Sequence, residues 1–393
     1  MIGRLRAVLR ERRRRILPLE FRALRGAPID ADAVALWGFV HAPIGLGTSA
    51  RGYARLLRDI VPQARVHALT LRDRDTVPFV ADPPTRRSGR NIVVLNPPEL
   101  LDGNRRFPNS LMTETHRIGY WVWELPHMPN DWVPALDLVD EIWTCSTFCA
   151  TAFAGRTAKP VHVLPHVVED WDHVERDTAR RTFGLPTDDT TIFLTVFDFS
   201  SGFHRKNPIG TIAAFRKAFG DGPAGPILVL KFHSSGRDPA AGAALAAAAE
   251  PCPRIRAIDA ALPSEALHTL FDACDCFVSL HRSEGFGLNL AEAMMADRPV
   301  IATAYSGNTD FLSPDDGYPV EASLVPVPTG HYASHVGQTW AEPSLDCAIE
   351  WMRTVAGDPS AATARGRRGH TAVVDRLGSA AIGRRLRELL QAE

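Results

Sequence analysis

Two acidic residues stand eight positions apart in the second half of the chain, and the pattern around them indicates a ligand site. Glu284 follows the apolar run 276–280, which predicts a short buried strand, and Glu292 lies within 288–296, which predicts a helix. Ligands of open α/β sheets bind where strands end, and the free amides at the start of a helix favour anionic or oxygen-rich groups. The pair therefore predicts a site for a ligand that carries hydroxyl groups and phosphate.

Short apolar runs alternate with helix-like runs through most of the chain. In the first part, strands are expected at 33–40, 91–95, 116–123, 141–144 and 161–164. In the second part, they are expected at 191–196, 226–231, 255–258, 276–280 and 298–303. The first helix is expected at 49–60, with Ser49 as its cap. Strands that alternate with helices predict parallel, doubly wound sheets.

The organisation of these elements predicts two domains of similar size. A polar, charge-rich segment at 168–190 is expected to be the hinge between them. The N-terminal domain is assigned to 27–170 and the C-terminal domain to 171–371. The last part, 372–393, is expected to be a helix that packs back on the N-terminal domain, because its apolar residues follow helical spacing.

The composition is that of an ordinary globular protein. The chain has 393 residues, of which 45% are hydrophobic and 23% charged, and its formal net charge of −1 gives no reason to expect a nucleic-acid partner. No apolar run approaches the roughly 18–20 residues of a membrane span, and no secretory signal is apparent. The six cysteines are interpreted as free thiols in a reducing cytoplasm, since they lack the paired spacing of a zinc site.

The first 26 residues form a basic leader. They contain nine arginines and two glutamates, and Leu5, Val8 and Leu9 follow helical spacing. A basic amphipathic helix of this kind can dock on an anionic membrane face, which here would be the inner face of the plasma membrane. The alternatives are a solvated leader and a helix that packs on the body of the protein.

These motifs resemble the GT-B glycosyltransferases, and more narrowly the retaining enzymes of glycosyltransferase family 4. The strongest stretch is 283–294 together with 298–303, and 204–208 resembles the basic motif of that family. The segments 119–126 and 140–146 resemble a bacterial subgroup that builds surface polysaccharides. The implied fold is α/β, with two Rossmann-like, doubly wound domains that face each other across a cleft.

The resemblance also implies a role for each motif residue. Glu284 is expected to bind the hydroxyls of the donor sugar and Glu292 the ribose, while Lys206 compensates the charge of the leaving diphosphate. The arginine that usually precedes this lysine is missing, and Arg205 is expected to replace it. The donor-binding residues are then Gly45, Gly47, Arg205, Lys206, Asn207, Glu284, Gly285, Phe286, Gly287, Leu288 and Glu292.

The acceptor side is less specific in sequence. Polar residues near predicted strand ends of the N-terminal domain are Asn96, His116, Glu124 and His166. Glu124, and after it His116, is the expected catalytic contact to the donor sugar or the acceptor hydroxyl; for each, an ordinary structural role is the alternative. Three tryptophans in this region are expected to pack in the core rather than to stack on sugars, namely Trp121, Trp123 and Trp132.

The resemblance implies a retaining, metal-independent hexosyltransferase without a cofactor. Its donor is expected to be GDP-mannose or a UDP sugar, and its acceptor a saccharide or lipid-linked saccharide of a bacterial surface polysaccharide. Three alternatives remain open, namely a non-catalytic scaffold with the same fold, a sugar-nucleotide epimerase and a dinucleotide-dependent oxidoreductase. The last needs a G-x-G-x-x-G loop, and the sequence has Gly45 and Gly47 followed by Ala50, which that motif also accepts.

Overall fold

The computed structural model describes residues 19–71, 75–102, 107–109 and 112–391. Contacts divide the chain into two compact units. The first unit contains the described residues up to Trp123, His127–Val167 and the end of the chain from Ile382; the second contains Glu124–Pro126 and Val168–Ala381. Residues 1–18, which carry most of the expected basic helix, lie outside the described residues, and the short helix η1 (Leu19–Leu24) follows them.

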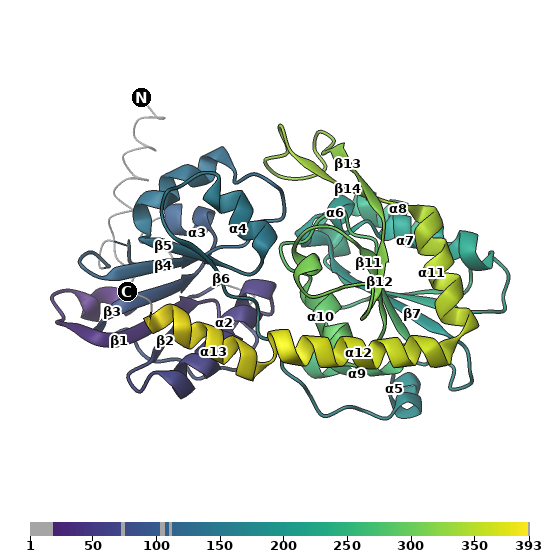
Figure 1. Ribbon diagram of the computed structural model, residues 1–393, viewed down its shortest axis with the longest axis horizontal. Coiled ribbons are helices and arrows are strands. Elements are labelled where there is room, and N and C mark those ends of the chain that lie inside the picture. The colour runs from purple at the N-terminus through teal and green to yellow at the C-terminus, as the bar shows by residue number, and fades with distance from the viewer. Residues whose placement is uncertain (1–18, 72–74, 103–106, 110–111, 392–393) are drawn as a thin grey trace. The chain divides into compact units, whose positions relative to one another are not determined.

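A six-stranded parallel sheet forms the centre of the first unit, in the order β2-β1-β3-β4-β5-β6. Its strands are β1 (Ile29–Gly38), β2 (Arg65–Ala68), β3 (Arg87–Val94), β4 (His116–Tyr120), β5 (Glu141–Thr144) and β6 (Val161–Val163). Its helices are α2 (Gly45–Ile60), α3 (Pro97–Leu101), η4 (Asn130–Leu138), α4 (Thr147–Ala154) and the larger part of α13 (Ser379–Gln391). Helix α13 runs beside α2 (Figure 1), where Gly383 faces Leu56 and Ile60.

The second unit repeats this plan with the order β12-β11-β10-β7-β8-β9, again parallel throughout. Its strands are β7 (Ile192–Asp198), β8 (Ile227–His233), β9 (Ile255–Asp259), β10 (Cys276–Ser279), β11 (Val300–Thr303) and β12 (Tyr318–Val320). Its helices include α5 (Arg176–Thr182), α6 (Phe203–Lys206), α7 (Pro208–Phe219), α8 (Pro239–Ala249), α9 (Ser264–Ala273), α10 (Leu288–Met295), α11 (Leu345–Gly357) and α12 (Pro359–Leu377).

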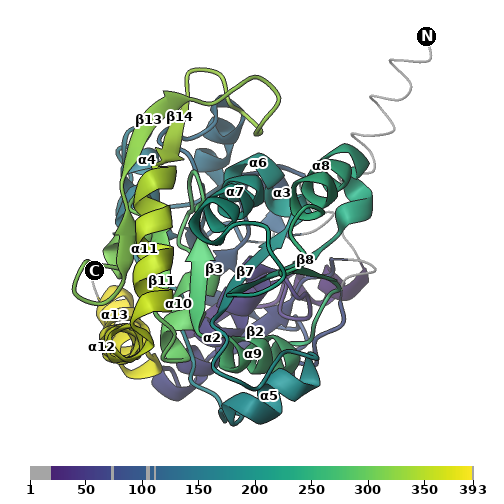
Figure 2. The ribbon, with the colours of Figure 1, turned by 90° about the vertical axis from the view of Figure 1, so that its right-hand side faces the viewer.

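Helices cover both faces of this second sheet, which explains why β7 and β8 are almost continuously apolar. Figure 2 shows α7 and α8 on one side of β7 and β8, and α9 and α5 on the other. On the first side, Phe215 and Met352 pack with Leu228 and Leu230 in one hydrophobic core. Because side chains alternate along a strand, Lys231 points to the opposite face, where α10 lies.

A separate antiparallel hairpin belongs to the second unit and was not expected from the sequence. Its strands β13 (Ala322–Pro326) and β14 (Thr339–Pro343) pair only with each other, and the loop 327–338 joins them. The turn is long, so the pattern of a two-residue hairpin is absent from the sequence.

The expected α/β architecture with two doubly wound parallel sheets is confirmed, while several boundaries were wrong. Helix α2 begins at Gly45, so Ser49 is not its cap; the Ser49 hydroxyl donates instead to the Gly45 carbonyl at 2.9 Å. The helix expected at 372–393 is interrupted at Gly378, which leaves the helical conformation with a ψ of 158°. None of the helices in the described ranges combines the length and apolarity that a bilayer crossing requires.

Candidate functional site

The candidate site lies where the strand order of the second sheet reverses. From β7 the chain passes to β8 and β9 on one side, and it then returns to place β10 on the other side of β7. The segments that follow β7 and β10 therefore diverge at the same edge of the sheet. Such a point leaves a crevice at the carboxyl ends of the strands, and this is the usual ligand site of the fold.

The loop after β10 is held by the turn that follows β11. The Glu284 amide donates to the Ser306 hydroxyl at 2.7 Å, and the Gly307 amide donates to the Glu284 carbonyl at 2.9 Å. His281, which directly follows β10, lies 3.1 Å from the side-chain oxygen of Asn308. The backbone of Glu284 is thus fixed by the turn that follows β11.

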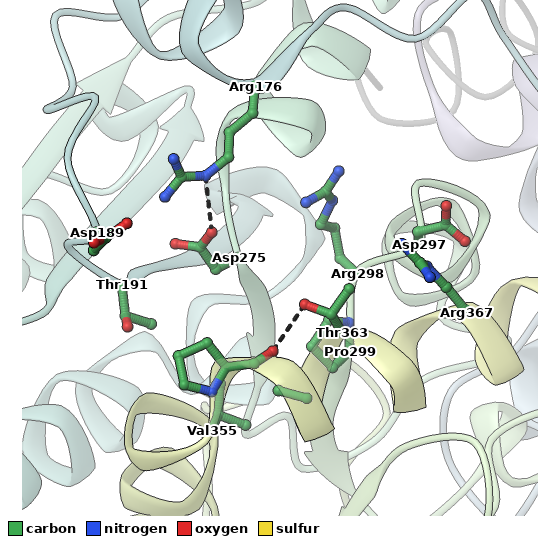
Figure 3. A pocket seen from close by; sticks show the side chains of 12 residues that line it. Arg176, Asp189, Thr191, Asp275, Asp297, Arg298, Pro299, Val355, Thr363 and Arg367 are labelled. Atoms are coloured by element: carbon green, nitrogen blue, oxygen red, sulfur yellow. Dashed lines mark hydrogen bonds and ion pairs between the residues drawn. The ribbon is translucent and has the colours of Figure 1, made fainter.

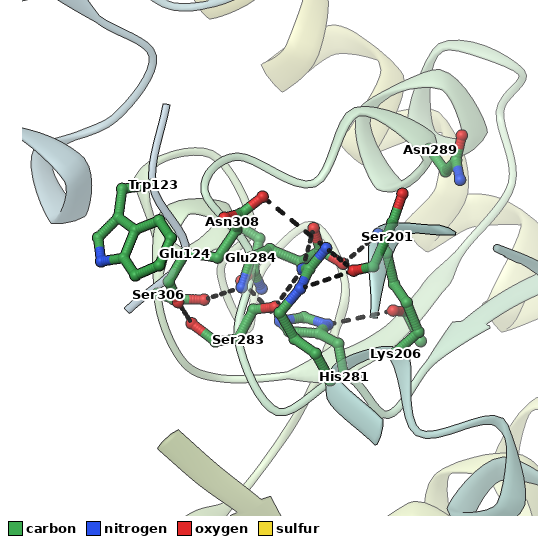
Figure 4. Close-up of polar contacts among 12 residues, drawn as sticks. Trp123, Glu124, Ser201, Lys206, His281, Ser283, Glu284, Asn289, Ser306 and Asn308 are labelled. Carbon is green, nitrogen blue, oxygen red and sulfur yellow. Dashed lines mark hydrogen bonds and ion pairs between the residues drawn. The ribbon is translucent and has the colours of Figure 1, made fainter. Parts of the chain in front are cut away.

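Two basic side chains converge on the Glu284 carboxylate (Figure 4). Lys206 Nζ lies 2.5 Å from Oε1, and Arg205 Nη1 lies 3.0 Å from Oε2. Arg205 is buried and also donates to the carbonyls of Ser283, at 2.7 Å, and Ser201, at 2.8 Å. The sequence-predicted residues Arg205, Lys206 and Glu284 therefore form one cluster, although 78 positions separate Lys206 from Glu284 in the chain.

Burial and charge act against each other in this cluster. Burial alone would raise the pKa of Glu284, but Arg205 and Lys206 hold that pKa well below its usual value. Burial alone would lower the pKa of Arg205, but the Glu284 carboxylate raises it above its usual value. For Lys206, burial lowers the pKa and the same carboxylate opposes the shift. The cluster thus holds an ionised carboxylate between cations, in a setting with little water to screen them.

Asn207 lies between α6, which contains Arg205 and Lys206, and α7, which packs in the hydrophobic core. It adopts the left-handed conformation, with a φ of 51°, between α6 and α7. Its side chain accepts from the Gly210 amide at 3.1 Å and donates to the Leu280 carbonyl at 2.8 Å. The hydrogen bonds of this side chain are therefore used inside the protein, and they tie the cation helix to the loop after β10.

Helix α10 starts at the site without a side-chain cap. Gly287 is its N-cap, with a φ of 97° that a residue with a side chain rarely adopts, so the first amides of the helix meet no capping group. One turn later, the Oε2 atom of Glu292 is buried and has no hydrogen-bond partner among the described residues. Burial raises the pKa of Glu292 to about 7, although nearby Lys231 lowers it.

Lys231 lies near Glu292 and was not among the site residues expected from the sequence. It is 4% exposed, and burial lowers its pKa, with Asp198 and Glu292 as the nearby opposite charges. Its place inside the apolar run 226–232 could have identified it, because a lysine is rarely buried in a strand unless it pairs with an opposite charge.

Glu124 and Tyr332 extend the cluster. Glu124 Oε1 lies 3.9 Å from Arg205 Nη2, and the Tyr332 hydroxyl donates to Glu124 Oε2 at 2.8 Å. Tyr332 belongs to the loop of the β13–β14 hairpin, and nothing in the sequence pointed to it. Glu124 therefore belongs to the second unit, where it lies beside Arg205.

The two glycines of the first unit do not form the expected loop. Gly45 and Gly47 lie in the first turn of α2, and a Cβ at Gly47 would come within 2.2 Å of the Ala42 carbonyl oxygen. Buried Arg51 donates to the carbonyls of Val40 at 3.2 Å and Ala42 at 3.0 Å. Only glycine fits this close approach, which brings the exit of β1 against the start of α2.

His116 and His166 belong to the first unit, and each contacts other side chains of that unit. His116 begins β4 at the amino end of the strand, opposite to the ligand edge, and its Nε2 lies 3.0 Å from a Glu141 oxygen. His166 is buried, and its Nδ1 contacts the Ser49 hydroxyl at 2.8 Å and the Tyr120 hydroxyl at 3.1 Å. Burial lowers its pKa to about 3, so His166 is neutral in the folded protein.

The remaining candidates of the first unit have contacts within that unit. The side-chain oxygen of Asn96 accepts from the Val122 amide at 2.8 Å. Trp121, Trp123 and Trp132 are buried, which confirms their expected packing role. All six cysteines are free thiols, and within the described ranges no three or more His, Cys, Asp or Glu side chains gather as a metal site would require.

A pocket of about 460 Å³ lies elsewhere in the second unit (Figure 3). It opens at the amino ends of the strands, beside Thr191, Asp275 and Pro299, and thus at the edge opposite to Glu284. The Asp275 carboxylate in this pocket is bound within the protein, since it accepts hydrogen bonds from Arg180 at 2.6 Å and from the Ile192 amide at 2.7 Å. The size of this pocket therefore does not outweigh the chemistry at the carboxyl edge.

Comparison with known protein families finds a match within the second unit. A family model described as Glycosyl transferases group 1 matches residues 258–325, a stretch that contains β10, α10 and both acids. A search of curated protein sequences finds no match.

Solved structures show the likeness over nearly the whole chain. The Anabaena protein HepE, solved with UDP and glucose, is 12% identical with a TM-score of 0.66 and covers 91% of this chain and 99% of its own. Sucrose-phosphate synthase from Thermosynechococcus elongatus is 15% identical with a TM-score of 0.66 and covers 91% and 98%. A glycosyltransferase from Rickettsia africae is 12% identical with a TM-score of 0.63 and covers 93% and 100%. At these identities the likeness shows the fold, and it confirms the GT-B architecture.

Proposed function

We propose that this chain, which has the GT-B fold and carries a glycosyl transferases group 1 region, is a glycosyltransferase that uses a nucleoside-diphosphate sugar. The observation that carries the proposal is the cluster of Arg205, Lys206 and Glu284 at the switch point of the second sheet. It combines cations for a diphosphate with a carboxylate for sugar hydroxyls, at the edge where the fold binds ligands.

The cluster assigns a step to each of its side chains. The Glu284 carboxylate offsets part of the positive charge of Lys206 and Arg205. When a donor binds, its diphosphate takes the place of the carboxylate as their counter-charge, and Glu284 is released to accept hydrogen bonds from the hydroxyls of the sugar. As the glycosidic bond breaks, the two cations stabilise the negative charge that grows on the diphosphate.

Glu292 is proposed to hold the ribose. Its buried Oε2 atom has no hydrogen-bond partner in the part of the chain that the structure describes, and the two adjacent hydroxyls of a ribose would donate to it. Glu124 lies on the other side of Arg205 and is proposed to orient the donor sugar or the acceptor hydroxyl. His116 is left out of this assignment because of its position at the amino end of β4.

The proposed reaction is retaining and needs no enzyme nucleophile. The acceptor hydroxyl attacks the face of the sugar from which the diphosphate departs, and a phosphate oxygen of the leaving group takes the proton of that hydroxyl. Positioning and charge stabilisation then supply the catalysis. Arg205 and Lys206 provide the charge that a metal ion provides in other transferases, so transfer is proposed to persist in the presence of a chelator.

The donor is proposed to be a hexose nucleotide. GDP-mannose follows from the resemblance to the polysaccharide subgroup, and a UDP sugar is supported by the UDP and glucose bound to HepE. The acceptor is proposed to be a saccharide or a lipid-linked saccharide of a bacterial surface polysaccharide, which the protein meets at the inner face of the membrane.

The test is a thermal-shift screen of the purified protein with UDP, GDP and dTDP sugars, followed by transfer assays with the donor that stabilises it most. Binding of one nucleoside diphosphate that weakens in Lys206→Ala, together with transfer that is lost in Glu284→Ala, is the expected result. The proposal fails if no nucleoside diphosphate binds, or if Glu284→Ala transfers sugar as fast as the wild type.

A further inference from the structure

The loop of the β13–β14 hairpin packs against α6, the helix that contains Arg205 and Lys206. The ring of Tyr332 lies against Arg205, with the guanidinium carbon 5.5 Å from the ring centroid. The same ring approaches Gly202 so closely that a Cβ there would come within 2.8 Å of it. Next to it, the ring of His331 stacks on His204, with centroids 3.7 Å apart. The hairpin loop therefore covers the helix that carries Arg205 and Lys206.

Arg282 connects strand β14 of the hairpin to helix α6. This guanidinium forms a two-point ion pair with Glu342 of β14, at 2.6 and 2.9 Å, and it lies over the ring of Trp340 at 5.4 Å. It also donates to the His204 carbonyl at 2.6 Å. A paired Arg–carboxylate fork of this kind fixes geometry in addition to adding energy, so the hairpin and the cation helix are held together.

Tyr332 of this loop forms a hydrogen bond with Glu124. The hydroxyl of Tyr332 donates to Glu124 Oε2 at 2.8 Å, while the other oxygen remains 3.9 Å from Arg205. Burial raises the pKa of Tyr332 well above its usual value, so the hydroxyl keeps its proton and remains a donor. Without this bond, the Glu124 carboxylate would be free to approach Arg205 and would turn the guanidinium away from Glu284.

We propose that Tyr332 is a positioning residue of the transfer reaction, which rests on the proposed function. Its hydroxyl holds Glu124 at a distance from Arg205, and its ring holds the guanidinium toward Glu284. The hairpin loop is then a working part of the donor site, although no strand of either central sheet contains it.

The test is a double-mutant cycle of Tyr332→Phe and Glu124→Gln, with Val336→Ala as the matched control. Val336 lies in the same loop and is 85% exposed. Tyr332→Phe keeps the ring and removes one hydrogen bond to a charged group, so kcat is expected to fall about 10- to 100-fold while KM for the donor changes about twofold or less. Val336→Ala is expected to keep the kcat of the wild type.

The cycle separates positioning through Glu124 from a general structural effect. If Tyr332 acts through Glu124, the double variant is no slower than Glu124→Gln alone. Losses that multiply in the double variant, or a kcat of Tyr332→Phe within about twofold of the wild type, overturn the inference. Melting temperatures of all four proteins are measured alongside, and an equal melting temperature with a lower kcat supports it.

Failure of the inference and failure of the proposed function give different results. A wild-type protein that neither binds a nucleoside diphosphate nor transfers sugar overturns the proposed function and the role of Tyr332 with it. An active wild type that is indifferent to Tyr332→Phe overturns the role of Tyr332 alone.

Discussion

Lys206 Nζ lies 2.5 Å from Glu284 Oε1, although 78 positions separate the two residues in the chain. The ion pair joins the segment after β7 to the segment after β10, which are neighbours only because the sheet order reverses between them. A buried ion pair costs the solvation of both partners, and this cost is hard to justify by stability alone. The proposed function gives this pair a role, because the diphosphate of a donor would replace Glu284 as the counter-charge of Lys206.

Glu284→Gln is the first prediction. The variant keeps the shape of the side chain and loses its charge, so two charge-assisted bonds to sugar hydroxyls of about 1.5 kcal/mol each are lost, and transfer is expected to fall about 100-fold. The affinity for UDP or GDP is expected to stay or to rise, because the cations no longer share a carboxylate with the diphosphate. Calorimetric titration and initial-rate assays on the same samples measure the two effects.

The control for Glu284→Gln is Asp315→Asn, which removes the same charge from an exposed position in the same unit. It is expected to match the wild type in both measurements. A Glu284→Gln protein that loses nucleotide affinity and transfer by equal factors would contradict the division of labour between the acid and the cations.

Lys206→Ala is the second prediction. Removal of the ammonium takes away one counter-charge of the diphosphate and leaves Glu284 less neutralised, so the affinity for the nucleoside diphosphate is expected to fall about 10- to 100-fold. The salt dependence of binding should also weaken, because fewer charges are paired on binding. Exposed Lys217 supplies the control variant Lys217→Ala, in which both quantities should match the wild type.

The position of this site was predictable for a simple physical reason. An apolar run at 276–280 must be a buried strand, so Glu284 had to appear at its exit, and the GFG loop had to turn the chain into α10. The basic residues before Pro208 stand in the same relation to β7. Local patterns of this kind depend only on neighbours in the chain, and this is why they could be read without a structure.

Other parts of the site depend on contacts that no local pattern records. Tyr332 meets Glu124 across 208 positions, and its loop shows neither strand nor helix periodicity. The start of α2 was misplaced because Gly45 and Gly47 indicate a loop, whereas the Thr48 amide already donates to the Ile44 carbonyl at 2.9 Å. His116 is the first residue of the strand expected at 116–123 and it also begins β4, so its role at the site stays a prediction.

The pH dependence of nucleotide binding is the third prediction. Burial raises the pKa of Glu292 to about 7, so the carboxyl is protonated at pH 6 and ionised at pH 8. An ionised carboxylate accepts stronger hydrogen bonds from ribose hydroxyls, and binding of UDP or GDP should therefore tighten several-fold between these pH values. In Glu292→Gln this tightening should be smaller, because only the ionisation of the phosphate remains.

The comparison uses titrations of both proteins at pH 6, 7 and 8 in one buffer system. The phosphate contribution is common to both proteins, so the difference between them isolates Glu292. A wild type and a variant whose affinities change in parallel over the whole range would show that Glu292 does not face the nucleotide.

Acid stability of the first unit is the last prediction. His166 is buried as a neutral side chain with a pKa of about 3, whereas an unfolded histidine titrates near 6.5. The unfolded state therefore takes up a proton that the folded state refuses, so the stability present above pH 6.5 is lost as the pH falls toward 3. Between pH 7 and pH 5 this linkage lowers the free energy of unfolding by about 2 kcal/mol.

Urea unfolding of the wild type and of His166→Gln at both pH values measures this change. The free energy of unfolding of the variant should fall by about 2 kcal/mol less than that of the wild type. The exposed His127→Gln is the control and should follow the wild type. Equal acid losses in His166→Gln and the wild type would mean that His166 is protonated in the folded protein, in contact with Ser49 and Tyr120.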